Sequence, residues 1–429
     1  MSNAFIVVGL GYGDEGKGTI VDYLTRQHGA HTVIRFNGGA QAAHNVITPD
    51  GLHHTFAQFG SGTLAGAHTY LSRYMIINPF DFYLEAQHLK YLGITDPYSL
   101  VSFSPEALVT TPLHIAANQI REEFRSGKHG TCGKGIGETQ FIYNVLGDTV
   151  AVKVKDLYQA GVVESKLNRL SEFYCETLAE DFYNQHGKTI DIAKSYQDFQ
   201  KLITIREDKY VRSLIDTGHT VIFEGAQGIL LDQDVGFHPH TTWSHTTSRN
   251  ARILADDADD LLVIGVTRAY STRHGEGPFF EGLTAVLDEQ HNSHEGLQGR
   301  FRHGPWDAIA LDYAAKCDSI DEVAVTCLDQ IDNWESVWSY DYFGDMPDLL
   351  PYFWAEGRRI FQINTGHDRA HSEAITTRLK YCKANINMHE DVDSDYIIDA
   401  IGEVLHAPVT IQSFGPSSVD KKSQVLTWT

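Results

Sequence analysis

The sequence has few cysteines, no long apolar run and a deficit of positive charge. The cysteines are scattered and form no C-x-x-C pair, which favours a reducing cytoplasm over a disulfide framework. No stretch approaches the roughly 18 apolar residues of a membrane span, and no basic segment precedes the short apolar run at the N-terminus. We therefore expect a soluble, cytoplasmic protein without a membrane partner. The five cysteines are Cys132, Cys175, Cys317, Cys327 and Cys382.

Acidic residues outnumber basic residues by 56 to 34, which gives a formal net charge of −22. A field of this sign repels phosphate backbones and anionic lipids, so we expect neither a nucleic-acid-binding nor a membrane-surface protein. A small phosphorylated ligand stays possible, because it needs only a local cluster of positive groups. The 429 residues, 42% of them hydrophobic, are ordinary for an α/β enzyme with a large core.

Predicted strands and helices alternate along the chain, without a low-complexity linker or a repeat of about 20–50 residues. The pattern predicts strands over 4–8, 32–36, 220–223, 261–266, 322–326 and 409–411, and helices over 79–91, 113–124, 306–317 and 397–405. Residues 164–216 are predicted to be mostly helical, and 52–58 to form part of a hairpin. This alternation favours an α/β fold: a single large, mostly parallel sheet flanked by helices. Polar, glycine-bearing segments follow the strands, where open parallel sheets bind ligands.

The most informative stretch is the glycine-rich segment after the first predicted strand. Residues 11–17 fit the first seven positions of the phosphate-loop pattern G-x-x-x-x-G-K-[ST], which places Lys17 near a nucleotide's outer phosphates. The eighth position departs from the pattern, because Gly18 replaces the magnesium-binding Ser or Thr and Thr19 comes one residue late. Asp14 is the natural replacement, since a hard cation prefers carboxylate oxygen.

Two other interpretations of this segment remain open. Residues 11–16 also fit the dinucleotide fingerprint G-x-G-x-x-G, which requires an acidic residue about 20 positions further on. The only charge at the end of the second predicted strand is that of Arg35. A plain turn without a ligand would leave the charges of Asp14, Glu15 and Lys17 unexplained. The phosphate loop is favoured over both.

Other polar residues give weaker signals. His44 follows the second predicted strand, but it is one of 22 histidines and a lone histidine is usually structural. Arg300 and Arg302 share one side of an extended segment and suit carboxylate or phosphate recognition, unless they form a solvated basic turn. Asp329, at a predicted strand end, suits a guanine edge but is also common in turns. Three further histidines have a spacing unlike standard zinc patterns: His238, His240 and His245.

Six segments, in order along the chain, resemble motifs of the adenylosuccinate synthetase family. They are 13–18, 130–137, 224–228 with 230–232 and 246–247, 269–273, 299–302 and 413–416. One such match would be weak, whereas six in the family's order are specific. The resemblance implies a single synthetase-like domain over residues 1–429 and a homodimer of purine biosynthesis.

The resemblance also implies a GTP-dependent carbon–nitrogen ligase with Mg²⁺ as its cofactor. The γ-phosphate of GTP is moved onto the 6-oxygen of a purine nucleotide such as IMP, GMP or dGMP, and an aspartate-like amino acid then displaces phosphate. Asp14 would be general base and metal ligand, with Ala43 as the second metal-binding position. His44 would be the acid beside the transferred phosphoryl group, and Gln227 would donate to the 6-oxygen.

Binding positions follow from the same resemblance. Those expected for GTP are Gly13, Glu15, Gly16, Lys17, Gly18, Thr19, Asn45, Asp329, Ser413 and Gly415. Those expected for the acceptor nucleotide or the amino acid are Gln41, Thr131, Cys132, Thr242, Arg300 and Arg302. Asp329 would contact the guanine, and the two arginines would contact the aspartate carboxylates.

The chain departs from the family pattern mainly on the acceptor side. Residues 138–152 contain no basic residue, although the family takes from this region an arginine that grips the acceptor phosphate of the neighbouring subunit. Cys327 replaces the lysine that precedes the guanine-reading aspartate. The remaining replacements of family residues are Tyr12, Ala40, Gln41, Ala43, Cys132, Lys134, Leu297 and Gln298.

Phage relatives that act on dGMP show that the family can change its acceptor. Two alternatives therefore stay open: a catalytically weak nucleotide-binding protein, or a ligase diverted to another acceptor or amino acid.

Overall fold

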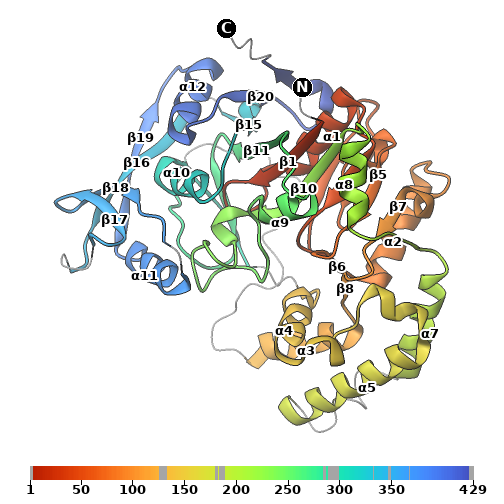
Figure 1. Ribbon diagram of the computed structural model, residues 1–429. Coiled ribbons are helices and arrows are strands. Elements are labelled where there is room, and N and C mark those ends of the chain that lie inside the picture. Colours follow the sequence, from red (N-terminus) through yellow and green to blue (C-terminus); the bar gives the residue numbers. More distant parts are fainter. Residues whose placement is uncertain are drawn as a thin grey trace.

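A large sheet forms the centre of the molecule in the computed structural model (Figure 1). The structure describes residues 3–124, 133–178, 182, 189–283, 287, 299–331, 333–345, 349–366 and 368–424. The sheet has ten strands in the order β21-β20-β15-β11-β1-β10-β2-β5-β7-β9. All neighbouring pairs are parallel except β20 and β21, which confirms the predicted fold class.

Most strands of this sheet are short and buried. Their bounds are β1 Ala4–Gly9, β2 Thr32–Arg35, β5 His68–Leu71, β7 Val101–Phe103, β9 Thr204–Ile205, β10 Val221–Gly228, β11 Leu261–Arg268, β15 Glu322–Thr326, β20 Val409–Ser413 and β21 Lys421–Ser423. Along β1, Ile6 and Val8 join one hydrophobic core, whereas Phe5 and Val7 join the core on the opposite face. A strand covered on both faces needs apolar residues at every position, which explains its unbroken apolar sequence.

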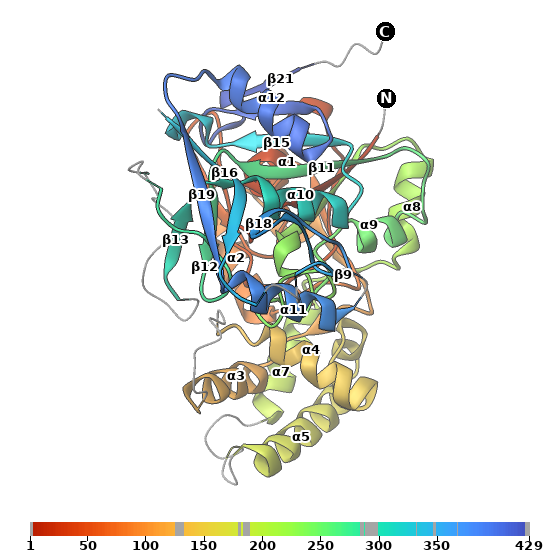
Figure 2. The same ribbon diagram turned by 90° about the vertical axis from the view of Figure 1, so that its left-hand side faces the viewer.

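Helices cover the sheet and also form a separate group below it (Figure 2). Those packed around the sheets are α1 Lys17–His28, α2 Pro79–Tyr91, α8 Lys209–Asp216, α9 Arg249–Leu254, α10 Ala308–Cys317, α11 Arg369–Leu379 and α12 Ser394–Leu405. The lower group comprises α3 Pro112–Phe124, α4 Ile136–Leu146, α5 Ala160–Thr177 and α7 Thr189–Gln200. Residues of this group share a hydrophobic core with α2, β5 and β7. Among the described helices, none is long and apolar enough to span a bilayer.

Smaller sheets lie beside the main one. A five-stranded sheet contains β14 Trp306–Asp307, β16 Trp334–Tyr342, β17 Phe353–Glu356, β18 Arg359–Ile363 and β19 Cys382–His389. Three two-stranded pairs are β3 His44–Ile47 with β4 His53–Phe56, β12 Ser271–His274 with β13 Phe301–Gly304, and β6 Ile76–Ile77 with β8 Leu108–Val109. The five-stranded sheet was not predicted. The helix predicted over 306–317 begins at Ala308, because Asp307 caps it and Trp306 joins β14.

Candidate active site

The candidate site lies along one edge of the main sheet, where parallel strands end. The glycine-rich loop follows β1, His44 follows β2, and Gln227 lies at the end of β10. The segments that begin at Cys327 and Phe414 follow β15 and β20. Because these strands are parallel, segments that are distant in sequence meet at the same edge.

The loop between β1 and α1 adopts a conformation that its glycines permit. Gly13 and Gly16 have φ values of 95° and 88°, and Asp14 also has a positive φ of 62°. Glu15 folds back into the loop, where its Oε1 accepts from the backbone N–H of Gly11 at 3.0 Å and of Gly13 at 2.8 Å. An internal carboxylate thus occupies amides that an anionic ligand could also use.

Lys17, at the start of α1, forms a buried ion pair with the same carboxylate. Its Nζ lies 2.5 Å from Glu15 Oε2, and the two side chains are 3% and 5% exposed. Two neighbouring strands fix the loop further: Arg268 donates to the carbonyl of Asp14 at 2.5 Å, and Thr326 donates to that of Glu15 at 2.7 Å. The loop is therefore shaped in advance by hydrogen bonds that do not involve a ligand.

Gly18 explains why the eighth position of the phosphate-loop pattern fails. A Cβ at Gly18 would lie 2.7 Å from the Cβ of His44, closer than two such atoms can approach. The absent side chain therefore lets β3 pack against α1 and brings His44 beside the loop. Thr19, one residue later, donates instead to the carbonyl of Pro416 at 2.6 Å.

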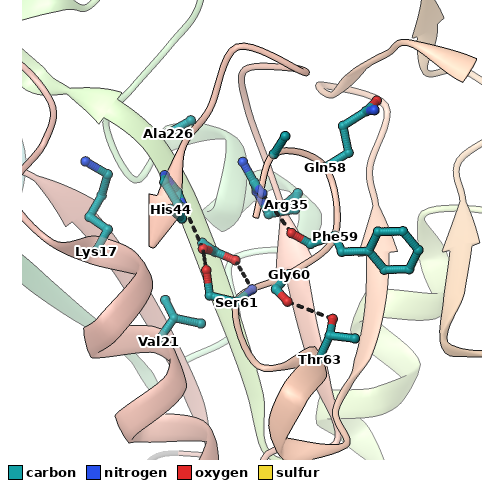
Figure 3. Close-up of polar contacts among 12 residues, drawn as sticks. Lys17, Val21, Arg35, His44, Gln58, Phe59, Gly60, Ser61, Thr63 and Ala226 are labelled. Carbon is teal, nitrogen blue, oxygen red and sulfur yellow. Dashed lines mark hydrogen bonds and ion pairs between the residues drawn. The ribbon is translucent and has the colours of Figure 1, made fainter. Parts of the chain in front are cut away.

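His44 belongs to a buried polar network drawn in Figure 3. Its Nδ1 lies 2.5 Å from Oε1 of Glu224, a residue of β10 with no exposed surface. The other oxygen of Glu224 accepts from the backbone N–H of Ser61 at 2.9 Å, and the Ser61 hydroxyl donates to Oε1. Glu224 therefore fixes the orientation of the imidazole and leaves its Nε2 for another partner.

Burial and the neighbouring charges shift the pKa values of this network in opposite directions. Burial alone would raise the pKa of Glu224, but the positive charge of Arg35 and the contact with His44 outweigh it and hold the pKa at about 2. Burial lowers the pKa of His44, and the Glu224 carboxylate opposes that shift. Arg35 is fully buried, and one of its nitrogens donates to the carbonyl of Phe59 at 3.1 Å. Glu224 is thus ionised and stabilises positive charge on His44.

Two amide side chains that are predicted to contact the acceptor have unpaired oxygens among the described residues. Gln227, at a positive φ of 66°, donates from Nε2 to the hydroxyl of Thr242 at 2.9 Å. Within the part of the chain that the structure describes, its buried Oε1 and that of Gln41 have no hydrogen-bond partner. Buried polar atoms are nearly always paired in folded proteins, so these two oxygens indicate a place for a ligand.

The two predicted arginines are brought together, but they meet an acidic residue of the chain itself. Arg300 donates from Nη2 to both carboxylate oxygens of Glu281, at 2.7 Å and 2.5 Å. Arg302 lies 3.9 Å from the same carboxylate and donates to the backbone carbonyls of Gly275 and Gly277. The Glu281 carboxylate therefore already contacts the two arginines that the family resemblance assigns to the amino-acid substrate.

The residues predicted to bind guanine lie on two neighbouring segments. Asp329 lies in a 3-10 turn, Leu328–Gln330, that follows β15 after Cys327 with its positive φ of 59°. At the end of the neighbouring strand β20, the Ser413 hydroxyl donates to the carbonyl of Gly415 at 3.1 Å. The β15–β20 pairing places these two segments side by side.

The sequence model of the family described as adenylosuccinate synthetase matches residues 6–421. The chain belongs to this family. The chain is 30% identical over 442 residues to the adenylosuccinate synthetase of Francisella tularensis subsp. novicida, a match that covers 97% of each chain. With the enzyme of Thermoplasma acidophilum the identity is 32% over 339 residues, 76% of this chain and 75% of the relative.

Two solved structures share the synthetase fold with the chain. The fully ligated adenylosuccinate synthetase of Plasmodium falciparum aligns with a TM-score of 0.80 at 20% identity, over 99% of this chain and 100% of the other. Cyanophage S-2L succinoaminodeoxyadenylate synthetase, bound to dGMP and to dATP as an energy donor, aligns with a TM-score of 0.59 at 15% identity. That match covers 99% of this chain and 95% of the phage protein.

The remaining predicted positions have simpler surroundings. Asn45 accepts from the Thr55 hydroxyl at 2.7 Å within the β3–β4 hairpin, and Ala43 is exposed just before β3. Thr131 and Cys132 lie outside the described residues. The three histidines considered for zinc do not form a common group: the described side chains that could share a cation are Asp232, Asp234 and His245.

Sequence reasoning missed three residues of the site: Glu224, Glu281 and Lys421. Glu224 belongs to a segment that the family resemblance singled out, yet its partner His44 lies 180 positions away. Glu281 and Lys421 belong to no expected motif. The one available signal was that Glu224 directly follows the strand predicted over 220–223, where open parallel sheets bind ligands.

Proposed function

We propose that the chain is a GTP-dependent ligase that joins a 6-oxopurine nucleotide to aspartate through a 6-phosphoryl intermediate. The observation that carries this proposal is the convergence of Lys17, Asp14 and His44 at one sheet edge, with His44 held by ionised Glu224. We further propose that residues 1–429 act as one synthetase-like domain and that the chain forms a homodimer.

Each step can be assigned to side chains of this edge. The carboxylate of Asp14 takes the N1 proton of the purine, so that its 6-oxygen attacks the γ-phosphorus and GDP leaves. Lys17 leaves its ion pair with Glu15 and binds phosphate oxygens of GTP. His44 donates a hydrogen bond from Nε2 to the phosphoryl group as it is transferred. The amine of aspartate then attacks C6, loses a proton, and expels phosphate.

Asp14 fits a role in binding Mg²⁺. Its side chain is 28% exposed, and its ion-pair partner is His274, whose Nε2 lies 3.7 Å from Oδ2. A partly exposed carboxylate at a phosphate loop is the hard oxygen ligand that this cation prefers, and the exposed backbone of Ala43 is the second position. When bound, the cation would neutralise phosphate charge.

The decisive experiment measures phosphate release from GTP with aspartate and Mg²⁺ in the presence of IMP, GMP or dGMP. We expect phosphate release that requires both the acceptor and aspartate. When the 6-oxygen of the purine is labelled with ¹⁸O, the label should appear in the released phosphate. GTP binding without turnover for any acceptor would contradict the proposal and leave a nucleotide-binding protein as the remaining interpretation.

Two observations favour a ligase that is diverted to another acceptor or amino acid as the second candidate. Residues 138–152 offer no cation for an acceptor phosphate, and the nearby Lys134 lies 2.9 Å from Asp81. Glu281 also holds Arg300. The same acceptor panel, repeated with other amino acids in place of aspartate, separates the two candidates.

A further inference from the structure

A buried lysine from the last described strand reaches the first turn of α1. Lys421, in β21, is 8% exposed, and its Nζ donates to the Thr19 hydroxyl at 2.5 Å. It also donates to the backbone carbonyls of Gly415 and Ser417, each at 2.8 Å. All three acceptors are uncharged, so none of these hydrogen bonds neutralises the ammonium.

The contacts of Lys421 join the phosphate-loop helix to the segment after β20. Thr19 accepts from Lys421 and donates to the carbonyl of Pro416, so one ammonium and one hydroxyl bridge the two elements. The segment is tightly folded, because a Cβ at Gly415 would lie 2.8 Å from Asp420. Removing the ammonium would take one donor from each of the Gly415 and Ser417 carbonyls, which would keep only the Ser413 hydroxyl and the Asp420 backbone N–H as donors.

Lys421 also lies at the sheet edge where the family resemblance predicts a lysine that this chain lacks. The family resemblance places a lysine two residues before Asp329, but this chain has Cys327 there. Lys421 pairs with Ser413 at the end of β20, and Gln412 pairs with Val325 near the end of β15, so Lys421 lies at the sheet edge that Cys327 and Asp329 follow. The last strand therefore supplies positive charge that the segment after β15 does not.

We propose that Lys421 is a positioning and specificity residue for the donor nucleotide, fixing the 413–417 segment against α1 and supplying the missing positive charge. This proposal rests on the proposed function. The acidic groups around it are Asp22 on α1, Asp420 beside β21, and Asp329 after β15. Burial lowers the pKa of Lys421 to about 8, and these groups only partly oppose the shift.

The test compares Lys421→Met and Lys421→Arg with the unmodified protein by calorimetry, using a non-hydrolysable GTP analogue. We expect at least tenfold weaker binding for Lys421→Met and recovery to within about threefold for Lys421→Arg, because arginine restores the charge. The KM for the acceptor should stay within twofold. Lys380→Met, at an exposed position on α11's C-terminal end, is the matched control.

A second measurement distinguishes positioning from simple loss of folding. A nucleotide anion should raise the pKa of Lys421, so binding near pH 8 should take up protons, seen as binding enthalpies that depend on the buffer's ionisation enthalpy. Lys421→Arg should reduce this uptake. Unchanged affinity and unchanged uptake would overturn the inference about Lys421 alone, whereas an unmodified protein that binds no GTP analogue would overturn the proposed function.

Discussion

The proposed donor and acceptor sides of the site differ in how their polar groups are paired. On the donor side, Lys17 is paired with Glu15 and Lys421 has three oxygen partners, all within the chain. On the acceptor side, the buried oxygens of Gln41 and Gln227 have no hydrogen-bond partner among the described residues. The polar groups on the proposed donor side are therefore paired within the chain, whereas two oxygens on the proposed acceptor side are free to pair with a ligand.

The largest expected effect concerns the chemistry shared by both sides. We predict that Asp14→Asn lowers the turnover number by about 10²–10⁴-fold, because an amide cannot accept the N1 proton and is a poorer metal ligand. Binding of the GTP analogue should change only a few-fold, since the carboxylate of Glu15, not Asp14, organises the loop amides. Unchanged steady-state rates would remove Asp14 from the mechanism.

The next prediction concerns the carboxylate that holds His44. Glu224→Gln should lower turnover by about 10²-fold, because the neutral amide no longer stabilises an imidazolium. Loss of that carboxylate lets the pKa of His44 fall further, so activity that requires protonated His44 should move to lower pH. Ser61→Ala is the matched control, since it removes one hydrogen bond to Glu224 and keeps its charge. Identical pH–rate profiles for Glu224→Gln and the unmodified enzyme would exclude this role.

Glu224 should also affect stability at low pH. Because its folded pKa of about 2 lies below the ordinary value, its ionisation stabilises the fold above about pH 4.5. This stabilisation is lost as the pH falls from about 4.5 toward 2. Melting temperatures of Glu224→Gln should therefore lie below those of the unmodified protein at neutral pH and approach them in acid.

Local patterns predicted the fold better than the site. The helix over 79–91 and the strand over 322–326 match α2 and β15, because periodicity and a helix-starting proline are local signals. The five-stranded sheet was missed because β19 is mostly polar and partly exposed, with no clear alternation. Lys421 was missed because it pairs with Thr19 across 402 positions, and only the fold reveals such a contact.

A smaller effect is expected on the choice of donor. We predict that Asp329→Asn reduces the preference for GTP over ATP by about tenfold or more, because an amide cannot accept from both guanine N–H groups. Leaving one of those donors unpaired costs about 1–3 kcal/mol. Competition between the two nucleotides measures the ratio. An unmodified enzyme that uses GTP and ATP equally well would contradict the assignment before any variant is made.

The smallest expected effect is on the amino-acid side, where the chain places its own carboxylate on Arg300. Glu281 is 42% exposed and Arg300 is 65% exposed, so solvent screens their ion pair and it contributes at most about 1 kcal/mol. Glu281→Gln should therefore lower the KM for aspartate by up to about fivefold, because the substrate no longer competes with an internal carboxylate. The KM for GTP should not change, and Glu356→Gln, at an exposed position of β17, serves as the control. A KM for aspartate that rises in Glu281→Gln would mean that Glu281 orients the arginines for the substrate instead of competing with it.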